Sequence, residues 1–245
     1  MSVNPLAQQF EEEVIYPESD GKLMADNTQQ FDWITNTVFN LRTLFQNDPN
    51  VFVAGDLLWY PVEGDNKICK APDVMVAFGR PKHHRGSYQQ WLEDNIAPQV
   101  VFEIRSPSNK DAEMETKFRF YQDYQVEEYY LYDPEKGQLK GWLRGTDQLH
   151  SIVPMHKWKS PRLGIRFELV EKELYLYYPD GRRFTTHDEE AKRAETEAKR
   201  AEAESKRAEA EAKRAEAAEA KLNRLKTLLE QQGISLNDDI FANDK

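Results

Sequence analysis

The pattern of apolar and polar positions divides the first 187 residues into segments of helical and of strand periodicity. Apolar side chains recur every three or four residues between positions 31 and 45, which predicts an amphipathic helix. Asp26 or Asn27 is suited to cap its first turn. The helix is expected to end before the Asp-Pro-Asn turn at residues 48–50.

Segments of strand character follow this helix. Residues 51–61, 73–78 and 100–105 are rich in β-branched and aromatic side chains, which predicts three strands. A helix is then expected over residues 110–124 and a fourth strand over residues 127–133. Several shorter β-rich segments follow. This order predicts an α+β domain in which one helix crosses between strands of the same sheet.

From residue 188 the chain changes character. Four consecutive heptads, all close to AKRAEAE, cover residues 191–218 and place alanine at alternating spacings of three and four. The apolar stripe then changes phase and consists of Leu222, Leu225 and Leu229. We expect a helix over residues 188–232, followed by a short acidic, flexible tail over residues 233–245.

Two interpretations of this helix stay open. It is a coiled coil that pairs two copies or docks a partner, or a solvated single helix. The second interpretation has support, because an alanine stripe buries little area and because Glu195 precedes Lys199 by four residues, a stabilising ion-pair spacing.

Composition narrows the function. The chain has 33 Lys and Arg against 43 Asp and Glu, a net charge of −10, which argues against tight non-specific nucleic-acid binding by the whole surface. A single cysteine, Cys69, excludes an internal disulfide and a cysteine-rich zinc site. No apolar stretch is long enough for a membrane span, and the N-terminus does not resemble a secretory signal. We therefore expect a soluble cytoplasmic protein.

One group of residues suggests chemistry. Asp73 opens one predicted strand and Glu103 lies inside the next, on the same face as Val101 and Arg105. Lys117 is on the helix that follows. Two carboxylates on neighbouring strands can hold Mg²⁺, and a nearby ammonium can orient a water molecule or stabilise developing charge. Taken singly, these residues are equally consistent with a turn aspartate, a solvent-facing glutamate and a surface lysine.

The order of these residues resembles a known family. The run APDVMVAFG, followed by VVFEIRSPSNK and by EEYYLYDP, resembles the Uma-type restriction endonucleases of the PD-(D/E)XK nuclease superfamily. The resemblance covers about residues 15–180. It implies a restriction-endonuclease-like mixed sheet flanked by helices, and cleavage of DNA that depends on Mg²⁺ or, as a substitute, Mn²⁺. Asp73 and Glu103 would be the metal ligands.

The resemblance has one departure. The superfamily places a lysine two residues after the glutamate, where this chain has Arg105. Arginine keeps its charge and can hold a phosphate, but it is a poor proton carrier. In relatives the lysine is often displaced onto the following helix, where Lys117 stands. We therefore assign water orientation or charge stabilisation to Lys117, keep Arg105 as a secondary candidate, and expect the carbonyl of Ile104 as a further metal ligand.

A short basic run is the candidate for DNA contact. It consists of Lys82, His83, His84 and Arg85. Such a run can bind phosphates, although a solvated loop explains it as well.

Five other polar residues receive simpler interpretations. Core packing is expected for Tyr121 and Tyr124, a helix start for Asp111, a turn for Asp20, and either a cleft or solvent for Asp56.

Two functions remain in competition. The first is a metal-dependent DNA endonuclease that forms a homodimer or another homo-oligomer through the C-terminal helix. The second is a catalytically inactive nuclease-fold module that binds DNA or protein, which Arg105 and the acidic net charge favour. The retained order of Asp73, Glu103 and Lys117 favours the nuclease.

Overall fold

The structure is a computed structural model that describes residues 14–21 and 23–232. The chain divides after His187 into two compact units. The predicted tail at residues 233–245 lies outside the described residues. No described helix is both long enough and apolar enough to cross a membrane.

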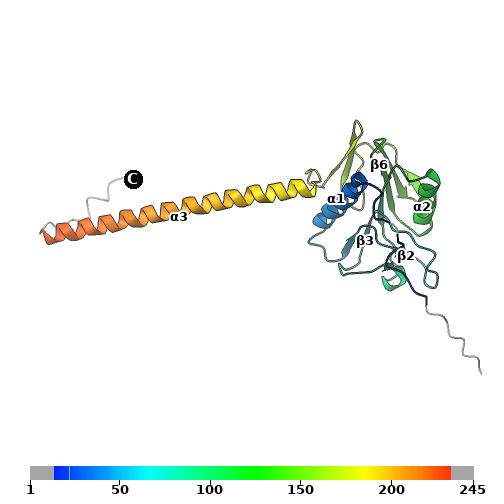
Figure 1. Ribbon diagram of the computed structural model, residues 1–245, viewed down its shortest axis with the longest axis horizontal. Helices are drawn as coiled ribbons and strands as arrows, with labels where there is room; N and C mark the ends of the chain where they lie inside the picture. The colour runs from blue at the N-terminus through cyan, green and yellow to red at the C-terminus, as the bar shows by residue number, and fades with distance from the viewer. Residues whose placement is uncertain (1–13, 22, 233–245) are drawn as a thin grey trace, which may run out of the picture. The chain divides into compact units, whose positions relative to one another are not determined.

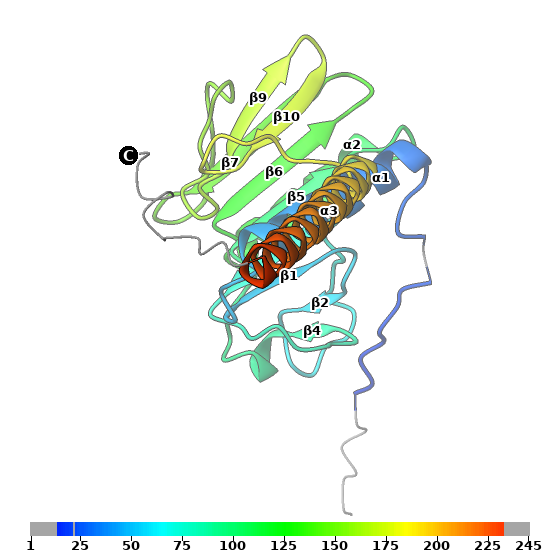
Figure 2. The same ribbon diagram turned by 90° about the vertical axis from the view of Figure 1, so that its left-hand side faces the viewer.

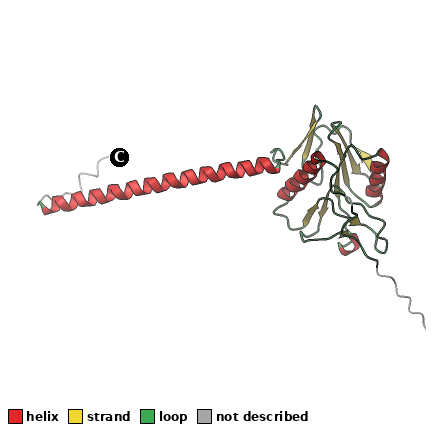
Figure 3. Ribbon diagram, in the orientation of Figure 1, coloured by secondary structure: helices red, strands yellow, loops and turns green. Residues whose placement is uncertain are grey.

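A six-stranded mixed sheet forms the centre of the first unit. Its strand order is β1-β3-β5-β6-β7-β8, and β5 and β6 are its parallel pair. Figure 3 shows the strands of this unit in yellow, with red helices on either side. The strands are β1 (Val51–Ala54), β3 (Val74–Phe78), β5 (Val100–Ile104), β6 (Glu128–Asp133), β7 (Gln138–Arg144) and β8 (Leu149–Ser151). Because a parallel pair needs a crossover, α2 (Asp111–Asp123) connects β5 to β6. The predicted α+β class and the helix crossover are confirmed.

Two small ribbons accompany the sheet. β2 (Trp59–Tyr60) pairs with β4 (Tyr88–Gln89), next to the short 3-10 helix Gln90–Leu92, and β9 (Arg166–Val170) pairs with β10 (Glu173–Tyr177). Figure 2 shows these ribbons at opposite edges of the main sheet.

The single strand predicted over residues 51–61 is wrong. Its two ends are β1 and β2, which belong to different sheets. The chain turns between them at Gly55 and Asp56, and Asp56 adopts a left-handed conformation with φ of 48°. Aspartate is among the few residues that adopt this conformation without a large cost.

One helix covers each face of the sheet (Figure 1). α1 (Thr28–Leu44) packs Ile34 and Leu41 into a core that includes Phe102 and Ile104. α2 packs Met114 and Tyr121 into a separate core on the other face; its strand residues include Val101 and Tyr129. The predicted alternation along β5 is therefore confirmed.

The N-terminus of α1 has a local cause. Of the two predicted capping residues, Asn27 is the cap, because its side-chain oxygen accepts a hydrogen bond of 2.9 Å from the main-chain N–H of Gln30. Asp26 is left free to make contacts with another part of the fold.

The second unit is helical. α3 (His187–Gln231) agrees with the predicted helix to within one residue at each end, and none of its residues is buried. Ion pairs of 2.6 Å join Lys199 to Glu195 and Lys206 to Glu202. Three leucines near its C-terminal end are about half exposed: Leu222, Leu225 and Leu228.

Candidate active site

Strand register brings the two carboxylates together. β3 and β5 are antiparallel, with Val74 opposite Phe102. One step further along the same register, Asp73 lies opposite Glu103. Directly opposed residues point to the same face of a sheet, with Cβ atoms about 5 Å apart. Both side chains are buried, at 7% and 2% exposure.

Two donors from α2 satisfy Glu103. The ammonium group of Lys117 donates to Oε2 over 2.6 Å, and the hydroxyl of Tyr121 donates a short hydrogen bond to Oε1. Lys117 and Tyr121 are four residues apart, which places them on one face of a helix. The predicted cost of a carboxylate inside an apolar strand is met in this way. The hydrogen bond of Tyr121 was not predicted, although its spacing from Lys117 pointed to it.

The main chain of β5 satisfies Asp73. The N–H of Ile104 donates to Asp73 Oδ2 over 2.6 Å. The other carboxylate oxygen has no hydrogen-bond partner among the residues that the structure describes. The carbonyl of Ile104 accepts a hydrogen bond of 2.8 Å from the side-chain amide of Gln30. Gln30, on α1, was not singled out from the sequence.

Burial and charge shift the titration of this group. Burial, and then the charge of Glu103, raise the pKa of Asp73 well above its ordinary value. Burial opposes the charge of Lys117, but the carboxylates of Glu103 and Asp73 outweigh it and raise the pKa of the ammonium. Burial and Glu103 raise the pKa of Tyr121. Lys117 is therefore cationic and Tyr121 is a neutral donor at neutral pH.

A further carboxylate lies at the margin of the pair. The N–H of Asp56 donates to the carbonyl oxygens of Pro72 and Asp73, over 3.1 and 3.3 Å. Partial burial, and then the charge of Asp20, raise the pKa of Asp56; Lys117 opposes this shift and Glu103 adds to it. Asp56 therefore lies within electrostatic reach of Asp73 and Glu103.

Comparison with known proteins identifies the family. The profile of the Uma2 family, described as "Putative restriction endonuclease", matches residues 6–170, which is more than half of the chain. The chain belongs to the Uma2 family. This match confirms the family resemblance inferred from the sequence. The site is therefore compared with what a nuclease would need.

A solved structure gives a weaker likeness. It is a nuclease, described as putative, of the DUF820 group from Anabaena variabilis, and it is 14% identical to this Uma2 chain. The match covers 56% of this chain and 75% of the other, with a TM-score of 0.43. No curated protein matches the chain.

Arg105 is turned to other partners in this Uma2 chain. Its guanidinium donates to Asp111 over 2.5 Å and to the carbonyl of Asn109 over 3.1 Å, and it lies 3.9 Å from Asp133. These contacts link the end of β5 to the first turn of α2, and the hydrogen bond from Arg105, together with its charge, lowers the pKa of Asp111. Lys117, and not Arg105, is the cation that contacts Glu103.

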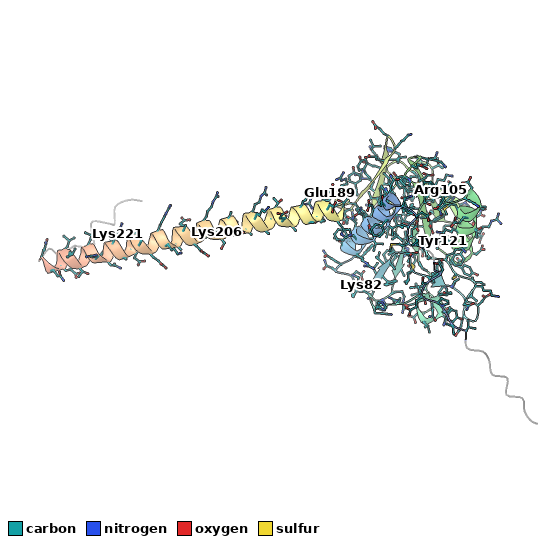
Figure 4. All side chains as sticks on the ribbon, in the orientation of Figure 1. Lys82, Arg105, Tyr121, Glu189, Lys206 and Lys221 are labelled. Carbon is teal, nitrogen blue, oxygen red and sulfur yellow. The ribbon has the colours of Figure 1, made fainter. Side chains whose placement is uncertain are left out.

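The basic run lies at the other end of the sheet. β3 begins after Asp73 and ends at Phe78, so the run follows the far end of a strand about 17 Å long. Figure 4 shows Lys82 well apart from Tyr121 and Arg105. Lys82 donates to the carbonyl oxygens of Phe45 and Gln46. The structure therefore does not bring this run to the carboxylates.

Within that run, Arg85 is buried and forms an ion pair with Glu93. Its side chain is only 3% exposed, donates to Glu93 over 2.5 Å, and lies over the ring of Phe52. Arg80 also donates to Glu93, over 2.9 Å. His83 and His84 are exposed.

One cavity of the first unit lies away from the carboxylates. It has a volume of about 520 Å³ and is bounded by α1, the end of β6 and β10, with Trp33 and Tyr132 in its wall. The carboxylate site is instead a pair of opposed side chains. No group of three or more His, Cys, Asp or Glu side chains within the described ranges is arranged to hold a metal ion.

Proposed function

We propose that the chain is a divalent-cation-dependent endonuclease that hydrolyses phosphodiester bonds of DNA. The observation that carries this proposal is the buried pair Asp73 and Glu103 on neighbouring strands, with the Lys117 ammonium 2.6 Å from Glu103. Membership of a nuclease family supports the substrate class.

Asp73 and Glu103 would hold Mg²⁺, or Mn²⁺ as a substitute. Mg²⁺ keeps several water ligands and needs only one or two carboxylates together with a substrate phosphate, so a pair of carboxylates fits it. Asp73 retains an oxygen with no hydrogen-bond partner among the described residues. When bound, such a cation polarises the phosphoryl group and lowers the pKa of a water ligand.

Lys117 supplies positive charge and hydrogen-bond donors. Because its pKa is raised, it stays protonated at neutral pH and does not serve as the base. Its ammonium has three donors, and one of them binds Glu103. The others orient the attacking water or stabilise the charge that develops on the phosphate. Arg105, paired with Asp111, serves this role only secondarily.

The basic run supports the DNA-binding part of the proposal. Lys82, His83 and His84 are exposed and present cationic or hydrogen-bonding groups to a phosphate backbone at a distance from the cleavage site. Arg85 holds the loop in place through Glu93.

The test is cleavage of supercoiled and linear DNA with Mg²⁺, Mn²⁺ or EDTA. We expect wild-type cleavage that EDTA abolishes, and loss of cleavage in Glu103→Gln and in Asp73→Asn. Asp73→Asn keeps an acceptor for the Ile104 N–H, so it provides a second variant if Glu103→Gln fails to fold. Glu115→Gln, on the exposed side of α2, is the matched control and should cleave like wild type.

Equal cleavage by wild type and both site variants would identify a contaminating nuclease and contradict the proposal. Metal-independent DNA binding without cleavage would favour an inactive nuclease-fold module instead. One observation favours that second function: both oxygens of Glu103 already have donors, and the carbonyl of Ile104 has one too.

We also propose that α3 pairs two copies of the chain. Its three half-exposed leucines would be covered in a dimer, and leucine side chains bury more area than the alanine stripe that precedes them.

A further inference from the structure

Both main-chain polar groups of Ile104 have side-chain partners. Its N–H donates to Asp73 over 2.6 Å, and its carbonyl accepts from Gln30 Nε2 over 2.8 Å. Ile104 directly follows Glu103 and is the last residue of β5, where the ladder with β3 has ended. The hydrogen bonds of Ile104 thus depend on one side chain from the site and one from α1.

Gln30 is itself held in a single orientation. It is 6% exposed, and its Oε1 accepts from the N–H of Asp26 over 2.8 Å. A main-chain N–H can only donate and a carbonyl can only accept, so the amide oxygen must face Asp26 and the amide nitrogen must face Ile104. Glutamate has the same shape but lacks the donor.

Asp26, the residue before the cap of α1, also holds the residues that follow Ile104. The carboxylate of Asp26 accepts short hydrogen bonds from the hydroxyls of Ser106 and Ser108, and these bonds lower its pKa. Gln30 in the first turn of α1 and Asp26 just before the helix are therefore bonded to the end of β5 and the segment that follows it, at Ile104 and at the Ser106–Ser108 turn.

We propose that Gln30 is a positioning residue of the active site. It fixes the carbonyl of Ile104, and through Ile104 it sets the placement of Asp73 and Glu103 relative to each other. This inference rests on the proposed nuclease function. Partners that orient metal ligands typically contribute 10- to 100-fold to metal affinity or activity, so Gln30 is expected to have an effect of that size.

The first variant is Gln30→Glu in the full-length chain, because it keeps the shape of the side chain while it replaces the donor to Ile104 with an oxygen and adds a negative charge. Gln29→Glu is the matched control, since Gln29 is exposed on the same helix and the change in charge is identical. Three properties are measured. They are the Mn²⁺ affinity, by calorimetry without DNA; kcat and KM for DNA cleavage, at a temperature well below the unfolding transition; and the thermal midpoint of unfolding.

We expect Gln30→Glu to weaken Mn²⁺ binding and to lower kcat by 10-fold or more, with KM for DNA nearly unchanged. Gln29→Glu should match wild type in all three quantities. Gln30→Met, which also lacks the donor but adds no charge, should show the same weakened Mn²⁺ binding; if it binds like wild type, the effect in Gln30→Glu is one of charge and the inference is wrong.

A lower thermal midpoint with wild-type Mn²⁺ affinity and kcat would show a purely structural role and overturn the inference. The proposed function fails separately: if wild type binds Mn²⁺ but does not cleave DNA, the nuclease proposal is contradicted, and the Mn²⁺ affinities of the variants still decide the role of Gln30. If wild type binds no Mn²⁺, both are overturned.

Discussion

At the scale of single residues, Glu103 shows how a buried charge is kept in an apolar strand. Its side chain is 2% exposed, and isolated carboxylates in such surroundings are strongly destabilising. Lys117 supplies a counter-charge and Tyr121 a neutral donor, so each carboxylate oxygen has a partner. Lys117 on α2 thus contributes to the stability of the site.

Removing that counter-charge should destabilise the fold. We expect Lys117→Met to lower the free energy of unfolding by about 3 kcal/mol, because it leaves Glu103 buried without a cation. Urea denaturation measures the change. Glu103→Gln combined with Lys117→Met should recover much of the loss, since the double variant leaves no buried charge. If Lys117→Met alone is as stable as wild type, solvent reaches Glu103 and the ion pair contributes little to stability.

The placement of Lys117 could be predicted from the sequence, but its contact could not. The order of Asp73, Glu103 and Lys117 along the chain, compared with the family pattern, indicated a common site. The contact of Lys117 with Glu103, and the role of Gln30 from a different helix, depend on how α1 and α2 pack on opposite faces of the sheet. No local pattern contains that information.

At the scale of elements, an ion-pair cluster joins the end of β3 to the 3-10 helix that follows β4. Glu93 accepts hydrogen bonds from Arg80 and Arg85, and its side chain is buried. Burial by itself would raise the pKa of Glu93, but the two guanidinium groups outweigh it and lower that pKa. The cluster explains why a basic run that looked suited to DNA places its arginine, Arg85, in the interior.

We expect this cluster to make stability depend on pH. The pKa of Glu93 is lower in the folded chain than in the unfolded one, so its contribution is fully present above about pH 5 and is lost as the pH falls through the folded pKa. Glu93→Gln should lower the free energy of unfolding by about 3 kcal/mol at pH 7. That difference should shrink below about pH 4.

Denaturant unfolding of both proteins between pH 3 and pH 7 measures this dependence. Asp94→Asn is the control, because Asp94 also contacts Arg80 but is mostly exposed. A difference between wild type and Glu93→Gln that is constant over this range would contradict the assignment of the pH dependence to Glu93.

At the scale of the whole molecule, the two units differ in what stabilises them. The first unit has a core on each face of its sheet, whereas α3 has no buried residue and relies on helix propensity and ion pairs four residues apart. A helix that is polar over most of its surface needs either such pairs or a partner.

We expect deletion of residues 188–245 to leave the thermal midpoint of the first unit within about 2 °C of the full-length value, since its cores contain no residue of α3. An insoluble product would show that α3 protects the first unit.

If α3 pairs two copies, the full chain should be a dimer by light scattering, and both the deletion and Leu225→Glu should be monomers. Glu204→Gln, on the polar surface, is the control; a monomeric full chain would contradict the dimer.

The sequence by itself determined the features that depend on local periodicity and capping. They include the bounds of α1, α2 and α3 to within one or two residues. They also include the strands β3, β5 and β6, and the division of β5 side chains between the two faces of the sheet. Each follows from side chains three, four or two residues apart, and such spacings are written directly in the chain.

Tertiary structure decided what depends on residues far apart in the chain. It divided residues 51–61 between two sheets, directed Arg105 to Asp111, and placed Lys82 at the end of the sheet away from Glu103. The site itself is of this kind, because Asp73 meets Glu103 only through strand register, and Ile104 meets Gln30 only through the packing of α1. Contacts between distant segments are set by the packing of whole faces, which no short sequence pattern specifies.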